Sequence, residues 1–226
     1  MKLLLFDIDG TLIRTAGAGK VSMERSFEDV FGIGNGFHNI HMMGRTDPSI
    51  LMEALSSHHL GWDEEKADRF RETYFSILKN EIQIPRPGKR VCPGVRPLLR
   101  LLDKRSDIIL GLLTGNWQQS AMIKLGYFKI DHYFTMGAFA DDSSDRNELV
   151  PIAIERLKKE QKIQIQKQNV YVIGDTPLDI HCAKPYGVRT MAVATGFHSF
   201  QDLASEKPDY LFHNFKQPEE VLRIFS

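Results

Sequence analysis

The sequence has few cysteines and no excess of either charge. Among its 226 residues only Cys92 and Cys182 are cysteines, which excludes a disulfide framework or a CxxC metal site. Lys plus Arg and Asp plus Glu both number 29, so no basic surplus points to nucleic acid or to an anionic membrane. We therefore expect no nucleic-acid partner and no membrane partner.

Long hydrophobic runs are also missing. After Met1 and Lys2, the first run has only four apolar residues before Asp7, which is too short for the hydrophobic region of a signal peptide. No run approaches the ~20 apolar residues of a membrane span. These features predict a soluble cytoplasmic protein.

Short apolar runs alternate with helical patterns along most of the chain. Strands are predicted at 3–6, 108–113, 133–136, 170–173, 188–194 and 210–212. Helical patterns lie between them, such as the one that places Val95, Leu98, Leu99 and Leu102 on one face. This alternation is typical of an α/β protein whose parallel sheet is covered by helices on both faces.

The segment 16–88 interrupts the alternation. It contains no convincing strand and three helical patterns, with Gly17 and Gly19 at its entrance and Pro85 and Pro87 near its exit. We interpret it as a helical domain inserted after the first strand, and 1–15 with 89–226 as the core domain. A flexible entrance and a stiff exit suit a lid that moves; a static helical layer is the alternative.

Acidic side chains follow two of the strongest predicted strands. Asp7 and Asp9 end the first, and Asp175 ends the strand at 170–173, with Asp179 four residues later. The carboxyl ends of parallel strands meet at one edge of a sheet, where ligands bind. Four carboxylates there would repel one another unless they shared a cation, and oxygen ligands alone favour Mg²⁺.

The spacing of Asp7 and Asp9 predicts a division of roles. Residues two apart on a strand project to the same side, so both carboxylates can face one reacting centre. Asp7 can attack phosphorus as a nucleophile and form an aspartyl-phosphate. Asp9 can act as general acid and base, first protonating the leaving oxygen and then activating water.

Other polar residues complete a predicted phosphate site. Thr114, Gly115 and Asn116 follow the strand at 108–113, where a hydroxyl and backbone N–H groups can bind phosphoryl oxygens. Arg146 begins a predicted helix, and its guanidinium can bind two oxygens at once. Asp145, directly before it, is the expected N-cap of that helix.

These elements resemble the four motifs of the haloacid dehalogenase superfamily. They are "DIDGT" at 7–11, Thr114, Arg146 and "GDTPLD" at 174–179, in the family's order and over the whole chain. The resemblance implies a Rossmann-like parallel sheet with a C1-type helical cap after the first strand. It implies Asp7 as nucleophile and Mg²⁺ held by Asp7, the backbone carbonyl of Asp9 and Asp175, with Asp179 in support. The basic residue is usually Lys in this family, and here Arg146 takes its place.

Within the superfamily, the chain looks most like phosphoglycolate phosphatases. Asp9 argues against dehalogenases and phosphonoacetaldehyde-cleaving members, which lack the second aspartate. The "GRTD" stretch at 44–47 resembles a cap loop that reaches the active site, so Arg45 is a candidate substrate contact. The same stretch suits a helix start capped by Asp47, which would make Arg45 structural.

The expected function is Mg²⁺-dependent hydrolysis of a small phosphorylated metabolite through an aspartyl-phosphate. The alternative is a phosphomutase of the β-phosphoglucomutase type, because it would use the same core residues. A non-catalytic regulatory protein is less favoured, since Asp7, Asp9, Thr114, Asp175 and Asp179 are all present. The sequence does not indicate whether the protein is a monomer or an oligomer.

Overall fold

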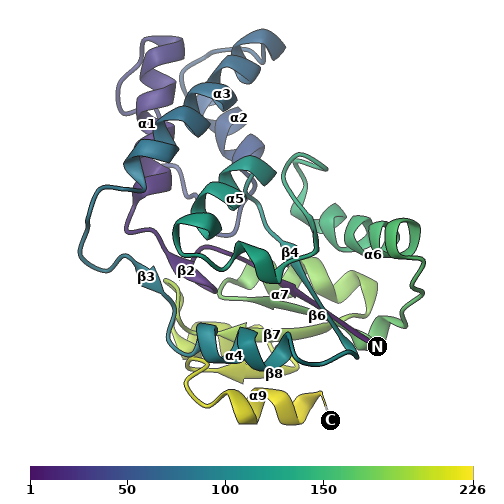
Figure 1. Ribbon diagram of the computed structural model, residues 1–226. Coiled ribbons are helices and arrows are strands. Elements are labelled where there is room, and N and C mark those ends of the chain that lie inside the picture. Colours follow the sequence, from purple (N-terminus) through teal and green to yellow (C-terminus); the bar gives the residue numbers. More distant parts are fainter. Residues whose placement is uncertain (226) are drawn as a thin grey trace.

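A six-stranded parallel sheet forms the centre of the molecule in the computed structural model, which describes residues 1–225 (Figure 1). In spatial order its strands are β5 (Met136–Ala138), β4 (Ile108–Leu113), β1 (Lys2–Phe6), β6 (Val170–Gly174), β7 (Arg189–Val193) and β8 (Tyr210–Phe212). Every neighbouring pair runs parallel. The expected Rossmann-like α/β core is therefore confirmed.

Strand β1 is buried on both sides, which explains its continuous apolar sequence. Successive side chains point to opposite faces, so Leu3 and Leu5 pack on one face while Leu4 and Phe6 pack on the other. Helices α6 (Leu149–Gln161) and α7 (Pro177–Ala183) cover the first face. Helices α4 (Val95–Leu102), α5 (Gln118–Tyr127) and α9 (Pro218–Ile224) cover the second, and α8 (Phe200–Ser205) packs beside β7 and β8.

Three helices form a separate layer above the strand ends (Figure 1). They are α1 (Ala18–Phe31), α2 (Asp47–Ser57) and α3 (Glu64–Glu81), and we call them the helical cap. Their shared core contains Phe27, Phe70 and Tyr74, together with Trp117 and Ala140 from outside the segment 16–88. The cap is thus packed against the core, and its predicted boundaries at 16 and 88 stay a prediction.

Two short strands connect the cap with the core. Strand β2 (Ile13–Arg14) carries the chain out and β3 (Arg90–Val91) carries it back. They pair antiparallel, with Ile13 opposite Val91 and Arg14 opposite Arg90. This pairing holds the two connections between core and cap side by side.

One predicted strand is wrong in position. The run 133–136 was expected to be extended, but Asp131–Tyr133 forms a 3₁₀ helix and β5 covers Met136–Ala138. Tyr133 and Phe134 instead pack against the core as partly buried side chains. The small residues Gly137 and Ala138 pair with β4 through their backbones. This backbone pairing, and not the hydrophobicity of the side chains, determines which residues form the strand.

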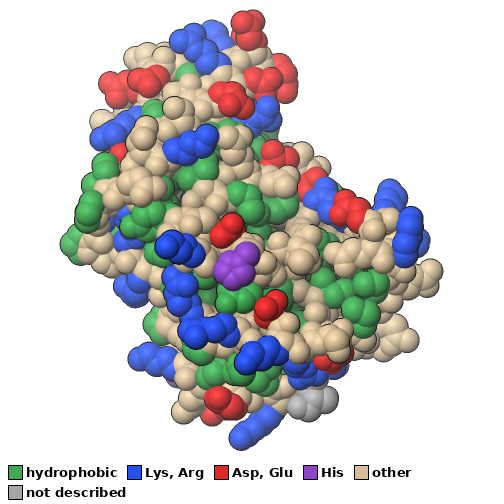
Figure 2. Space-filling view, viewed as in Figure 1, with side chains coloured by type: hydrophobic (Ala, Val, Ile, Leu, Met, Phe, Trp, Pro, Cys, Tyr) green, Lys and Arg blue, Asp and Glu red, His purple; other side chains and the backbone are tan. Residues whose placement is uncertain are grey.

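Charged side chains are unevenly distributed on the face in Figure 2. Acidic and basic side chains alternate over the helical cap, whereas Lys and Arg predominate in the lower half of this face.

None of the helices within residues 1–225 has the length and apolar character needed to cross a membrane. The predictions of no nucleic-acid partner and of a cytoplasmic location stay predictions.

Candidate active site

The register of the sheet brings the predicted acidic residues to one edge. Phe6, the last residue of β1, lies opposite Leu112 of β4 and Ile173 of β6. The next residue, Asp7, donates its backbone N–H to the carbonyl oxygen of Ile173 at 2.8 Å. Asp7 and Asp175 therefore leave adjacent strands at nearly the same level, as the sequence predicts.

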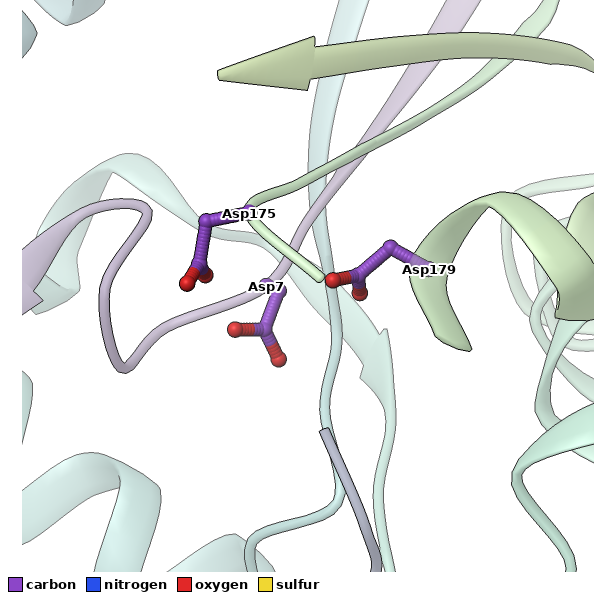
Figure 3. Close-up of side chains that lie close together, drawn as sticks. All are labelled: Asp7, Asp175 and Asp179. Atoms are coloured by element: carbon purple, nitrogen blue, oxygen red, sulfur yellow. The ribbon is translucent and has the colours of Figure 1, made fainter. Parts of the chain in front are cut away.

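Three carboxylates converge at this edge (Figure 3). Asp7 follows β1, Asp175 follows β6, and Asp179 lies in the first turn of α7. One oxygen of each lies within 4.8 Å of the others, and all three side chains are buried. Burial, followed by the charge of Asp179, raises the pKa of Asp7 to about 7, although Arg146 opposes this shift. Burial and the neighbouring Asp7 also raise the pKa of Asp175 well above its usual range.

Arg146 is the cation within this cluster. It lies in a 3₁₀ turn, Arg146–Glu148, directly before α6, and Asp145 caps the turn as expected. Its Nη2 donates to Asp7 Oδ1 at 3.0 Å and to Asp179 Oδ1, while Nη1 donates to the carbonyl oxygen of Gly44 at 3.0 Å. Its buried Nε has no partner among residues 1–225. The structure thus brings Arg146 beside Asp7, and the predicted catalytic roles of both residues stay predictions.

The turn after Asp9 completes the pocket around Asp175. Thr11 Oγ1 donates to Asp175 Oδ1 at 2.8 Å. Gly10 has φ +93°, and a Cβ there would lie 2.3 Å from Asp175 Oδ2. Only glycine combines this backbone conformation with such a close approach, so the position of Asp175 requires glycine at position 10.

Asp9 points to a different set of partners. Lys124 Nζ donates to Asp9 Oδ2 at 2.6 Å, and Asn116 Nδ2 donates to the same oxygen at 3.0 Å. Lys124 also donates to Asn116 Oδ1 at 2.5 Å, which closes a three-membered network. Within residues 1–225, no donor is bound to the other oxygen, Asp9 Oδ1. One carboxylate oxygen of Asp9 is thus fixed and the other is available.

Thr114 supports this network from the end of β4. Its Oγ1 accepts from Asn116 Nδ2 at 2.7 Å and from the Asn116 backbone N–H at 3.2 Å. The hydroxyl is completely buried, whereas Gly115 and Asn116 line the cavity described below. Thr114 therefore orients Asn116, and its predicted contact with a phosphoryl oxygen stays a prediction.

Lys124 was not predicted from the sequence. It lies on α5 and is only 4% exposed. Burial alone would lower its pKa, but the nearby Asp9, Tyr74 and Asp47 outweigh this and raise the pKa, so the ammonium stays charged. The available signal was a lysine within an apolar helical pattern that contains Ala121 and Leu125.

The "GRTD" loop of the cap contacts the core at the end of β4. Asp47 donates its backbone N–H to the Gly115 carbonyl oxygen at 2.7 Å, and its Oδ2 accepts from the Trp117 N–H at 2.9 Å. A Cβ on Gly115 would lie 2.0 Å from the Arg45 carbonyl oxygen, so this close approach needs glycine. The helix cap is Thr46, not Asp47 as expected. Burial raises the pKa of Asp47 to about 7, although Lys124 opposes this shift.

The guanidinium of Arg45 is held by the cap itself. It forms an ion pair with Glu53 and donates to the carbonyl oxygens of His41 at 3.2 Å and Ser49 at 3.1 Å. Arg45 nevertheless lines the cavity with its neighbours Gly44 and Asp47. Its predicted contact with substrate stays a prediction.

A single cavity of about 490 Å³ connects these groups. Its floor contains Asp7, Asp9 and Asp175, and the side chains of the cap that close it include Met23 and Ile50. The cavity is large enough for a small metabolite and is bounded by both core and cap.

The fold and the acidic strand ends define a class: a Rossmann-like α/β protein with a helical cap over a cluster of carboxylates at the strand ends. The sequence of residues 4–193 matches the haloacid dehalogenase-like hydrolase family, and the chain belongs to this family. The resemblance inferred from the motifs is therefore confirmed, as is the expectation of a hydrolase.

Several relatives cover nearly the whole chain. A phosphoglycolate phosphatase from Pseudomonas savastanoi pv. phaseolicola is 24% identical over 96% of this chain and 78% of its own length. The pyrophosphatase PpaX from Oceanobacillus iheyensis is 26% identical over 96% of this chain and 94% of its own. Among solved structures, a hydrolase from Pseudomonas syringae aligns over 100% of both chains with a TM-score of 0.72 at 19% identity, which supports the fold.

Proposed function

We propose that the protein is a Mg²⁺-dependent phosphatase that hydrolyses a small phosphorylated metabolite through an aspartyl-phosphate on Asp7. The observation that carries this proposal is the contrast between Asp7 and Asp9 in one cavity. Asp7 lies in a cluster of buried carboxylates beside Arg146, and Asp9 is bound through one oxygen to Lys124 and Asn116. The relatives named phosphoglycolate phosphatase and pyrophosphatase support a substrate of this kind.

The residues at the carboxylate cluster fit a magnesium ion. The donor set is carboxylate oxygen alone, from Asp7 and Asp175 with Asp179 in support, and the backbone carbonyl of Asp9 can add a ligand. Gly10 and Gly196 leave room around Asp175, because a Cβ on either would lie within 2.3 Å of its Oδ2. When bound, Mg²⁺ supplies positive charge against the phosphoryl oxygens and the three carboxylates.

Asp7 and Asp9 then have separate tasks. A carboxylate oxygen of Asp7 attacks phosphorus, and the bond from phosphorus to the leaving oxygen breaks. Asp9 gives its proton to that oxygen, and later takes a proton from the water that hydrolyses the aspartyl-phosphate. Arg146 keeps Asp7 oriented through Nη2, and Lys124 with Asn116 keeps Asp9 oriented through its Oδ2. Substrate binding by Thr114, Gly115, Asn116 and Arg45 belongs to the same proposal.

A screen of small phosphomonoesters tests this proposal. The protein with Mg²⁺ should release inorganic phosphate from at least one ester, and chelation of the metal should stop the release. Product analysis separates the mutase alternative, which predicts interconversion of glucose 1-phosphate and glucose 6-phosphate without net phosphate release. If no ester releases phosphate, the phosphatase proposal fails, and isomerisation alone supports the mutase alternative.

A further inference from the structure

The wall beside Asp9 determines what kind of leaving group the cavity accepts. Asp9 must reach the leaving oxygen, so the group attached to that oxygen lies next to Asp9 and its neighbours. Asn116 and Lys124, which also line the cavity, are bound directly to Asp9. Three further lining residues, Gly19, Tyr74 and Asp47, lie close to Lys124. We call Lys124, Gly19, Tyr74 and Asp47 the leaving-group wall.

The one cation of the leaving-group wall is already paired. Lys124 Nζ is bound to Asp9 Oδ2 at 2.6 Å and to Asn116 Oδ1 at 2.5 Å, and Asp47 lies close enough to raise its pKa. Lys124 therefore balances the charge of Asp9, and Asp47, whose pKa burial raises to about 7, is only partly ionised near neutral pH. A carboxylate on the substrate would add a negative charge that no unpaired cation of this wall offsets, which is unfavourable in a buried site.

The other cations that line the cavity have other partners. Arg146 is paired with Asp7 and Asp179, and Arg45 is paired with Glu53. The two remaining cations, Lys20 and Arg14, are not bound to residues of the leaving-group wall. Lys20 is 57% exposed and lies 3.7 Å from Glu24, and Arg14 donates to the Gly196 carbonyl oxygen at 2.7 Å.

Polar atoms of the leaving-group wall suit a hydroxyl. An ammonium has three donors, and only two of those on Lys124 are used. A Cβ on Gly19 would lie 3.4 Å from Lys124 Nζ and 3.8 Å from Tyr74 Oη, so both atoms border the same small space above Gly19. Because burial raises the pKa of Asp47 to about 7, this carboxyl can either donate or accept near neutral pH. A hydroxyl donates and accepts, and it adds no charge.

We propose that the substrate is the phosphate ester of a small polyol, with an uncharged hydroxyl rather than a carboxylate beside Lys124, Tyr74 and Asp47. This inference rests on the proposed phosphatase activity and narrows it to a substrate class. It predicts that phosphoglycolate, the substrate in the name of several relatives, is a poor substrate here. The site should discriminate against esters with a carboxylate because that carboxylate meets unfavourable charges, and not only because the hydroxyl of a polyol ester gains contacts.

Two matched pairs of esters test the proposal. One pair is 2-hydroxyethyl phosphate and 2-phosphoglycolate, and the other is glycerol 3-phosphate and 3-phosphoglycerate. Within each pair the hydroxyl ester should have the higher kcat/KM by about tenfold or more, equivalent to ~1.4 kcal/mol. Ratios below about three, or a preference for the carboxylates, overturn the inference while leaving the phosphatase proposal intact. No phosphate release from any ester, p-nitrophenyl phosphate included, overturns both.

A glycine substitution tests where the hydroxyl binds. Gly19→Ala fills the space between Lys124 and Tyr74, so kcat/KM for the better hydroxyl ester should fall by about tenfold. Gly126→Ala is the matched control, because it also lies in a helix and a Cβ there meets nothing within 4 Å. Equal activity of the two variants on the hydroxyl ester overturns this placement, provided that both keep the melting temperature of the wild type.

A change in charge tests the cause of the discrimination. Asp47→Asn removes one carboxylate from the leaving-group wall and keeps an oxygen that can accept from the Trp117 N–H. The preference for hydroxyl over carboxylate esters should shrink severalfold in this variant. An unchanged ratio contradicts the charge argument, whatever happens to the absolute rates.

Discussion

The two ends of the cavity hold similar side chains but differ in their balance of charge. At the end that we propose binds the metal, here called the metal end, Asp7 and Asp179 are paired with Arg146, and Asp175 lies beside them. At the leaving-group end, Lys124 offsets the charge of Asp9, and Asn116 links the two. The first end is therefore incomplete without a further cation, whereas the second is nearly neutral as it stands.

This difference teaches how one motif, "DIDGT", serves two kinds of chemistry. Asp7 and Asp9 are two residues apart, yet their carboxylates belong to separate electrostatic environments. The pKa of Asp7 is raised to about 7 by burial and by Asp179, so without a metal its ionised form is disfavoured. The following predictions test this contrast, from the largest expected effect to the smallest.

Removing the nucleophile should abolish activity without harming the fold. Asp7→Asn keeps the shape of the side chain but cannot form an aspartyl-phosphate, so phosphate release should fall roughly 10⁴-fold or more. The variant also relieves repulsion within the metal end, so its melting temperature in chelator should match or exceed that of the wild type. Exposed Asp103 provides the control, and Asp103→Asn should retain full activity. Residual activity above a hundredth of wild type would contradict the role of Asp7.

Removing the cation of the leaving-group end should have a smaller effect. Lys124→Met leaves Asp9 without its charged partner, so kcat for an alkyl phosphate should fall by about 10- to 100-fold, with less change in KM. The exposed Lys79 in the last turn of α3 is the control, and Lys79→Met should leave kcat unchanged. A change confined to KM would contradict the role of Lys124 in orienting Asp9.

Magnesium should stabilise the protein more at high pH than at low pH. Asp7 has a pKa of about 7 in the fold against an ordinary value of 3.8, and the pKa of Asp175 is also raised. A raised pKa contributes stability below the unfolded value and loses it as pH rises through the folded value. The metal-free protein should therefore lose stability as the pH rises from 3.8 to about 7. Added Mg²⁺ should compensate for this loss of stability.

The increase in melting temperature on adding Mg²⁺, measured by calorimetry, should be several degrees at pH ~8 and smaller at pH ~5, where protons compete for the carboxylates. Asp7→Asn should reduce the difference between the two pH values. An equal increase in melting temperature at both pH values would mean that the metal binds away from Asp7 and Asp175.

The mildest effect is expected at Arg45. Because Glu53 already holds its guanidinium, Arg45→Ala should lower kcat/KM for the best substrate by only about two- to fivefold, and that for p-nitrophenyl phosphate less. Steady-state kinetics on both substrates measure this. A loss above tenfold on the best substrate alone would mean that Arg45 leaves Glu53 and contacts the substrate directly.

The metal end was predictable from the sequence because it depends on strand ends. Buried strands can be recognised from continuous apolar runs, and a parallel sheet brings their carboxyl ends together. Asp7, Asp9 and Asp175 could therefore be placed from their position after each run. Arg146 was found because it opens a helix, although its two carboxylate partners lie far away in the sequence.

The leaving-group end could not be predicted in the same way. Lys124 lies in the last turn of α5 and Tyr74 lies within α3, and a single lysine in an apolar helical pattern is a weak local signal. Their role depends on how α3 packs against α5, which the hydrophobic pattern of either helix leaves open. The strand at 133–136 failed for a related reason, because pairing with β4 selects Met136–Ala138 instead.

Mass spectrometry of trapped phosphoenzyme tests the division between the two ends most directly. Asp9→Asn should still be phosphorylated by acetyl phosphate, whose leaving group needs no proton, but should hydrolyse the aspartyl-phosphate slowly. The account predicts one added phosphoryl group on Asp7 with Mg²⁺, and none with chelator or in the Asp7→Asn/Asp9→Asn double variant. A phosphoryl group on another residue, or no adduct with Mg²⁺ present, would contradict it.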